Sequence, residues 1–174
     1  MKDENPELNL LNKYEYDAIE VRSVKVYFSK EKSEINIHPD ELDKVLEIIP
    51  SAHLLLIPRI YVVSYFCQDC IETKGRHLAG LNYIVLYPNS VDKLKEVLIH
   101  EVGHLIWDRK LNPQQRIEFY YLMLKEVPAT LNKNDKLEKY IFVLENFANS
   151  YLFYLLGIFD EERYPNIYKF ISSL

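Results

Sequence analysis

The stretch SVDKLKEVLIHEVGHLIW occupies residues 90–107, and its apolar residues recur at the spacing of one buried helix. Inside it, the pentapeptide HEVGH runs from His100 to His104. Residues four apart share a helix face, so both imidazoles can bind one tetrahedral metal ion while Glu101 reaches a water bound to that metal. Burying these side chains is unfavourable unless they bind a partner, which favours a metal site. A core helix whose histidines are satisfied by other side chains is the alternative.

Tetrahedral zinc with one open position needs a third protein ligand. The extended signature HExxHxxGxxH is absent, because Trp107 and Lys110 stand where it requires glycine and histidine. The other histidines, His38, His53 and His77, lie upstream, and we expect them at the surface or in turns.

Glu145 is the predicted third ligand, in the helical run YIFVLENFANSYLFYLL. Its neighbours Ile141, Phe142 and Ala148 at helical spacing place it on the core side of that helix. A carboxylate there is unfavourable to bury, and a metal would remove the penalty. Asn149, one turn later, could orient one histidine ligand by accepting a hydrogen bond from its second ring nitrogen. A purely local polar contact of Asn149 is an equally good interpretation.

The chain has 174 residues, a formal charge of −5 and 48% apolar residues, which fits one domain with a sizeable core. The acidic balance disfavours a nucleic-acid partner. Only four glycines occur, in neither GxGxxG nor GxxxxGK, so phosphate-binding loops are excluded. No apolar run is long enough for a membrane span and the charged N-terminus lacks a signal-peptide pattern, so we expect a cytoplasmic protein without a membrane partner. The oligomeric state is left open.

Strand patterns precede most helical patterns, which predicts an α+β fold with a small mixed or antiparallel sheet. Residues 1–20 are expected to form an N-terminal arm, and 21–174 the domain. Gly103 is expected at a crowded contact with the sheet or the glutamate helix, and Gly75 in an ordinary turn. The periodicities predict strands at 21–29, 59–66 and 81–87, and helices at 39–49, 90–107 (N-cap Asn89 or Ser90), 113–126, 136–156 (followed by Gly157 as C-cap) and 161–172.

With HEVGH at 100–104 and ENFAN at 145–149, the chain resembles the gluzincin group of zinc metallopeptidases, in which two histidines and a glutamate on a later helix bind the metal. The ENFAN run with Tyr151 resembles the ImmA/IrrE-like regulatory peptidases. Residues 38–63 are similar to the catalytic domain of anthrax lethal factor and to the archaeal minigluzincins. The resemblance covers about residues 39–157.

The resemblance implies a zincin-like single domain, with an active-site helix and a glutamate helix after the sheet. It implies a zinc metalloendopeptidase in which His100, His104 and Glu145 hold Zn²⁺. Glu101 would activate the zinc-bound water to hydrolyse a peptide or protein substrate. The strand before the active-site helix would pair with the extended substrate, through Leu81, Asn82, Tyr83, Ile84 and Val85.

Three departures from the resembled families stand out. Larger gluzincins have aspartate where Asn149 stands, and no DNA-binding helix-turn-helix of the kind often attached to ImmA-like proteins is evident. Lethal-factor-type enzymes place a tyrosine seven residues before the glutamate. That position is Glu138 here, and Tyr140 is two residues out of register, so the group that stabilises the transition state is unidentified.

Two alternatives to an active peptidase remain. In one, zinc serves structure or sensing in a non-catalytic regulatory domain on a zincin scaffold. In the other, the enzyme is latent because residues 160–174 fold back over the cleft. Cys67 and Cys70 lack a second CxxC pair, so two thiols in a connection between strands are favoured over half a zinc site, a redox pair or a disulfide.

Overall fold

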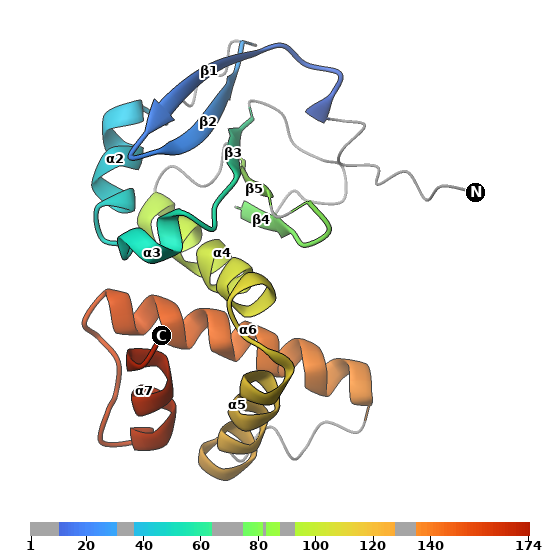
Figure 1. Ribbon diagram of the computed structural model, residues 1–174, viewed down its shortest axis with the longest axis vertical. Helices are drawn as coiled ribbons and strands as arrows, with labels where there is room; N and C mark the ends of the chain where they lie inside the picture. The colour runs from blue at the N-terminus through green and yellow to red at the C-terminus, as the bar shows by residue number, and fades with distance from the viewer. Residues whose placement is uncertain (1–10, 31–36, 64–74, 82, 88–92, 128–134) are drawn as a thin grey trace.

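Strands and helices form separate layers of the structure (Figure 1). The computed structural model describes residues 11–30, 37–63, 75–81, 83–87, 93–127 and 135–174. Within these residues, five strands form one mixed sheet and six helices gather on one side of it. The predicted α+β class with a small mixed sheet is therefore confirmed.

The strands lie in the order β1-β2-β3-β5-β4. β1 and β2 are antiparallel, β3 is parallel to both β2 and β5, and β4 runs antiparallel to β5. Their bounds are β1 Tyr16–Val21, β2 Val24–Ser29, β3 Arg59–Val62, β4 Gly75–Leu78 and β5 Tyr83–Leu86.

The strand expected at 21–29 is present as β2 from Val24, and it is the second strand of a β-hairpin whose turn lies at Arg22 and Ser23. Arg22 and Ser23 turn the chain with φ values of 48° and 67°. Two-residue hairpin turns require such left-handed conformations, which glycine and asparagine favour, so this dipeptide carries no turn signal in the sequence. The Arg22 side chain reaches Asp43 of the first described helix, with Nε 2.9 Å from Oδ1, and this ion pair anchors the turn.

Two other expectations about strands were wrong. The arm expected at 1–20 is shorter, because residues 16–20 belong to β1, and residues 1–10 lie outside the described part. β4 lies where the sequence predicts only a connection, and its four residues are too few to show a two-residue period. The strands predicted at 59–66 and 81–87 correspond to β3 and β5.

The predicted helices are present with small shifts of their ends. Asn112 caps α5 (Pro113–Glu126) through a capping box, and Asp135 caps α6 (Lys136–Leu155). Gly157, with φ of 68°, follows α6 as predicted. The N-cap expected at Asn89 or Ser90 lies outside the described residues. The helices are α2 Pro39–Leu46, α3 Ser51–Leu54, α4 Leu94–Arg109, α5 Pro113–Glu126, α6 Lys136–Leu155 and α7 Pro165–Ser172.

The sheet carries apolar side chains on both faces. On β3, Ile60 and Val62 face the helices and join the main core. Tyr61, and Val63 directly after the strand, belong to a smaller cluster on the opposite face. In that cluster the rings of Tyr27 and Tyr61 stack with centroids 4.9 Å apart. The alternation along β3 is that of a strand buried on both sides.

Two glycines set how closely α4 approaches its neighbours. A Cβ at Gly103 would lie 2.7 Å from Cα of Ala148, so α4 and α6 are in backbone contact there. Of the two neighbours that the sequence left open for Gly103, the sheet and the glutamate helix, the helix is the one it meets. Gly75 was expected in an ordinary turn, and this was wrong. It begins β4, and a Cβ there would lie 2.6 Å from Cγ1 of Val97 and 3.2 Å from Cγ of Glu101.

The C-terminal helix α7 packs against α5 and α6 (Figure 1). The carboxylate of Glu126 at the end of α5 accepts hydrogen bonds from the backbone N–H groups of Asn166 and Ile167, at 3.0 and 3.1 Å. Ile167 and Phe170 are buried in the main core. No helix among the described residues combines the length and apolar character needed to cross a membrane.

Replacement of Gly103 with valine is expected to lower the free energy of unfolding by roughly 1–3 kcal/mol or more, because overpacking must push α6 away from α4. Chemical denaturation measures this effect. Gly80→Ala is the matched control and should leave stability near that of the wild type, because a Cβ at Gly80 meets open space. Equal stability of Gly103→Val and the wild type would contradict the close contact.

Buried His53 predicts a pH dependence of stability. Its Nδ1 lies 2.7 Å from the Tyr151 hydroxyl and its Nε2 lies 2.8 Å from Nζ of Lys110. Burial, with the charge of Lys110, lowers the pKa of His53. In the unfolded chain its pKa is about 6.5, so below that pH the unfolded state binds a proton that the folded state does not.

The stabilising effect of a neutral His53 is therefore complete above about pH 6.5 and is lost as the pH falls toward the lower folded pKa. Urea denaturation at pH 5 to 8 should show a stability loss on the acid side that is smaller in His53→Gln than in the wild type. Parallel pH profiles of the two proteins would refute this role of His53.

Candidate metal centre

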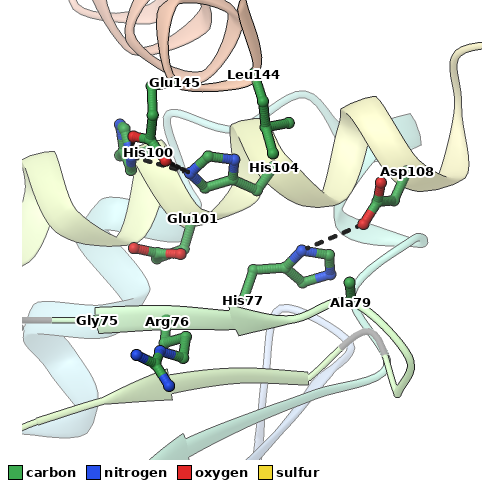
Figure 2. Close-up of a pocket in the computed structure, with 10 residues that line it drawn as sticks. All are labelled: Gly75, Arg76, His77, Ala79, His100, Glu101, His104, Asp108, Leu144 and Glu145. Carbon is green, nitrogen blue, oxygen red and sulfur yellow. Dashed lines mark hydrogen bonds and ion pairs between the residues drawn. The ribbon is translucent and has the colours of Figure 1, made fainter. Parts of the chain in front are cut away.

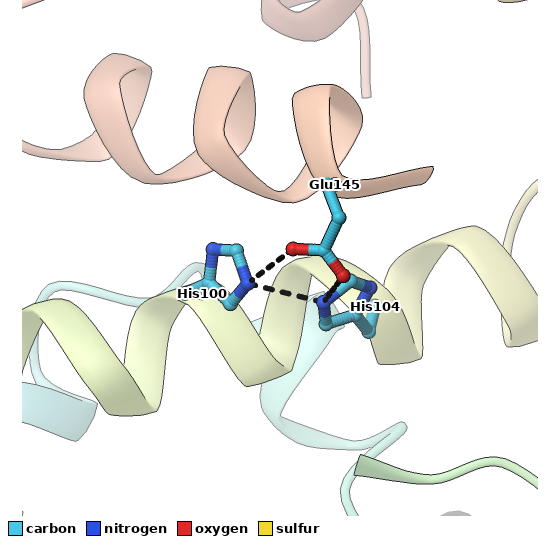
Figure 3. A group of neighbouring side chains, drawn as sticks. All are labelled: His100, His104 and Glu145. Carbon is cyan, nitrogen blue, oxygen red and sulfur yellow. Dashed lines mark hydrogen bonds and ion pairs between the residues drawn. The ribbon is translucent and has the colours of Figure 1, made fainter. Parts of the chain in front are cut away.

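Helices α4 and α6 bring two imidazoles and a carboxylate together (Figure 3). Nε2 of His100 lies 3.1 Å from Nε2 of His104. Oε2 of Glu145 lies 3.3 Å from Nε2 of His100, and its Oε1 lies 3.5 Å from Nε2 of His104. Among the described residues, these three form a group of potential metal ligands whose ligand atoms all lie within 4.8 Å of one another.

The spacing of these atoms can be compared with the geometry of zinc. Zinc binds nitrogen and oxygen ligands at about 2.0–2.1 Å, so neighbouring corners of its tetrahedron are about 3.3–3.4 Å apart. The three separations, 3.1, 3.3 and 3.5 Å, scatter around that edge length. The donor set and its spacing therefore fit zinc with one position left for a water or a substrate.

Asn149 contacts one of the two histidines. Its Oδ1 lies 3.1 Å from Nδ1 of His100, so an Nδ1–H can donate to the amide oxygen and leave Nε2 for a metal. Nδ1 of His104 is buried and has no hydrogen-bond partner among the described residues. Of the two rings, His100 is thus the one with a side-chain partner on its second nitrogen.

Glu101 is buried beside this group, on the side of α4 that faces β4 (Figure 2). Burial raises the pKa of its carboxyl to about 7, although the charge of His100 and a backbone hydrogen bond from His77 act in the opposite direction. A general base is most effective when its pKa lies near the working pH. Glu101 has the placement and proton affinity of such a base.

The electrostatics of the ligands follow from the same packing. Burial, with the charge of His100, lowers the pKa of His104 to about 4, so its ring is neutral near pH 7. Burial alone would lower the pKa of His100, but its hydrogen bond with Glu145 and the charges of Glu101 and Glu145 raise it. The hydrogen bond from His100 lowers the pKa of Glu145, which is therefore ionised. A neutral imidazole and an ionised carboxylate are the forms that bind a metal, so His104 and Glu145 are in those forms, whereas the raised pKa of His100 means that a metal competes with a proton for its ring.

A cavity of about 350 Å³ opens over the group between β4, α4 and α6 (Figure 2). His77 on β4 and Asp108 on α4 face each other across one end of it, with Nδ1 and Oδ2 3.6 Å apart. Asp108 follows His104 by one helical turn, a spacing that could have revealed it in the sequence. The lining residues are Gly75, Arg76, His77, Ala79, His100, Glu101, His104, Asp108, Leu144 and Glu145.

Two expectations about upstream histidines were wrong. The side chain of His77 is 4% exposed and lines this cavity, because β4 directs it toward α4. His53 is 3% exposed and binds Tyr151. His38 is exposed, as expected, and caps α2.

Glu145 is not buried on the core side of α6, contrary to the prediction from the sequence. Its side chain is 47% exposed, so it lies at the rim of the cavity rather than in the core. The helical periodicity correctly predicted that Glu145 lies on the face of α6 that meets α4. The cavity at that face is open to solvent. The unfavourable burial of an isolated carboxylate therefore does not explain this residue.

The predicted substrate strand at 81–85 is wrong in position. Tyr83, Ile84 and Val85 belong to β5, which pairs with β3 on one side and β4 on the other, so it has no edge to offer a peptide. Leu81 precedes β5, and Asn82 lies outside the described residues. Among the described strands, β4 is the outermost one on this side, and it lines the cavity.

The alternative of a latent form, in which residues 160–174 cover the cleft, is not what the described structure shows. None of these residues lines the cavity, and α7 is held against α5 and α6 instead. Tyr140 lines a different cavity, beside Trp107. Cys67 and Cys70 lie outside the described residues.

Comparisons of the chain with protein-family models, with curated proteins and with solved structures found no match.

The metal centre is tested by replacing Glu145 with alanine. We expect the wild type to bind about one zinc ion, and the variant to bind it at least about 100-fold more weakly, because one of three protein ligands is lost. Competition with a chromogenic chelator measures both. Glu138→Ala, an exposed carboxylate on the same helix, is the control and should bind zinc like the wild type. A full, tight zinc complement in Glu145→Ala would exclude Glu145 from the site.

Proposed function

We propose that the protein is a zinc-dependent metallopeptidase of the gluzincin type. The observation that carries the proposal is the tetrahedral spacing of His100, His104 and Glu145, with the buried carboxyl of Glu101 in the same cavity. A zinc ion, when bound, supplies a Lewis acid that polarises a carbonyl and makes a water more acidic.

The side chains of the site bind the metal, transfer the proton and orient a ligand. His100 and His104 hold the metal from one helix, and Glu145 holds it from the other. Glu101 accepts the proton of the attacking water and passes it to the amine that leaves, for which a pKa of about 7 is suited in both directions. Asn149 fixes the orientation of His100 through the 3.1 Å contact.

The position of the cavity favours a peptide or protein as the substrate. β4 lies on one side of it and Leu144 and Glu145 of α6 lie on the other. β4 is the outermost of the described strands here, so an extended chain could pair with it next to the metal ligands. His77 and Asp108 at one end are polar groups that a substrate would meet. The substrate therefore lies along β4 in this proposal, and not along β5.

A zinc-binding regulatory domain without catalysis is the second candidate. It is favoured by one observation: no tyrosine that could stabilise the transition state is among the described residues that line the cavity. Chelation distinguishes the candidates, because removing a structural zinc unfolds the domain. If the zinc is catalytic, a domain with a core of this size should stay folded when the zinc is removed and should lose only its activity.

Replacement of Glu101 with glutamine tests the catalytic role. The variant should keep its zinc and cleave peptides about 10²–10⁴-fold more slowly, because the amide cannot accept the proton. Cleavage is read by mass spectrometry of a peptide library incubated with the zinc-loaded protein. Glu118→Gln, an exposed site on α5, is the control and should cleave like the wild type.

Two outcomes would contradict the proposal. Zinc-loaded wild type that cleaves no peptide in the library would favour the regulatory domain. Identical fragments at identical rates from the wild type and from Glu101→Gln would assign the cleavage to another base.

A further inference from the structure

A second cavity, of about 400 Å³, lies between α4, α5 and α6. It shares no lining residue with the cavity of the metal centre. Its lining is Trp107, Arg116, Ile117, Tyr120, Lys136, Lys139, Tyr140 and Val143. Its volume is at the lower end of the range for cavities that bind small molecules, about 300–1,000 Å³.

The charges around this second cavity all have one sign. Arg116, Lys136 and Lys139 line it, and no described lining residue is a carboxylate. Among the described residues, no carboxylate forms an ion pair with any of the three cations. In a chain with a net charge of −5, an unneutralised group of three cations is a local reversal of the overall charge.

Arg116 is held in place by the end of α4. Its Nη2 donates to the backbone oxygen of Asp108 at 2.9 Å and its Nε to that of Leu111 at 3.2 Å. Its guanidinium carbon lies 5.9 Å from the centroid of the Trp107 ring. Both hydrogen bonds go to neutral carbonyls, so the positive charge is fixed in position but not neutralised.

The floor of the second cavity is apolar and aromatic. Trp107 is 2% exposed and Val143 is 1% exposed, and Tyr120 and Tyr140 flank them. The indole Nε1 of Trp107 is buried and has no hydrogen-bond partner among the described residues.

We propose that this second cavity binds a small organic anion, a carboxylate attached to an apolar or aromatic group. The apolar part would lie against Trp107 and Val143, where burial of its surface favours binding. The carboxylate would lie among Arg116, Lys136 and Lys139, which form charge-assisted hydrogen bonds with such a group. Cations around an apolar floor select against neutral and cationic molecules of the same shape.

Trp107 is the one tryptophan in the chain, so its fluorescence reports directly on this cavity. The full-length, zinc-loaded protein is titrated with 4-phenylbutyrate, 4-phenylbutanol and 4-phenylbutylamine, which share an apolar part and differ in charge. The acid should change the emission saturably and bind about tenfold more tightly than the alcohol, with the amine weakest. Equal binding of all three, or no saturable change with the acid, would overturn the proposal.

Variants locate the site. Lys136→Gln/Lys139→Gln should reduce the affinity for 4-phenylbutyrate about tenfold and leave that for 4-phenylbutanol unchanged. Lys25→Gln/Lys44→Gln removes two exposed charges elsewhere and should bind the acid like the wild type. Equal affinity of both double variants for the acid would overturn the assignment. The comparison of the three probes on the wild type holds even if a variant fails to fold.

Two further arms define the ligand. N-acetylphenylalanine carries the carboxylate of a peptide end, and its amide, in which that charge is removed, should bind more weakly. Tighter binding of N-acetylphenylalanine than of 4-phenylbutyrate would assign the site to peptide ends, and the reverse order would assign it to free acids. Either order supports the shared carboxylate chemistry. Chelation of the zinc should leave binding of 4-phenylbutyrate unchanged, and loss of binding would place the acid on the metal and overturn the proposal.

Discussion

The close approach of α4 and α6 is the constraint on which the candidate metal centre depends. With no side chain at Gly103, the backbone of α4 lies directly against Ala148 of α6. One turn away on each helix, His100 and Glu145 then come within 3.3 Å. A larger residue at either contact position would separate the helices and with them the two halves of the ligand set. The electrostatic effects on the pKa values of the ligands arise from the same proximity.

The parts of the fold and site that follow helical periodicity could be predicted from the sequence. HEVGH places two imidazoles on one face, and the spacing around Glu145 places its carboxylate on the face of α6 that meets α4. The position of Asn149 one turn later follows from the same period, and its contact with His100 is present. Which face of a helix these side chains occupy depends only on residues close together in the sequence, so a single sequence is enough to predict it.

What could not be predicted depends on partners far apart in the sequence. β4 is four residues long, and only its pairing with β5 makes it a strand. His77 and Gly75 acquire their positions against α4 from that pairing, so neither shows a local signal. The half-exposed state of Glu145 depends on the cavity between three elements, which no helical pattern describes. Arg22 and Ser23 adopt left-handed turn conformations that are unusual for their residue types, so the sequence does not predict them.

The parallel pairing within the sheet has a consequence for the order in which the molecule folds. β2 meets β3 at Val26 and Ile60, and β3 meets β5 at Ile60 and Ile84, so the central strands join distant parts of the chain. Closing such long loops loses chain entropy before contacts compensate, which slows folding relative to helical bundles. The helix contacts close loops that are longer still, because Glu126 meets Asn166 and His100 meets Glu145. We expect the ligands on α4 to meet Glu145 only when the long closure between α4 and α6 is made.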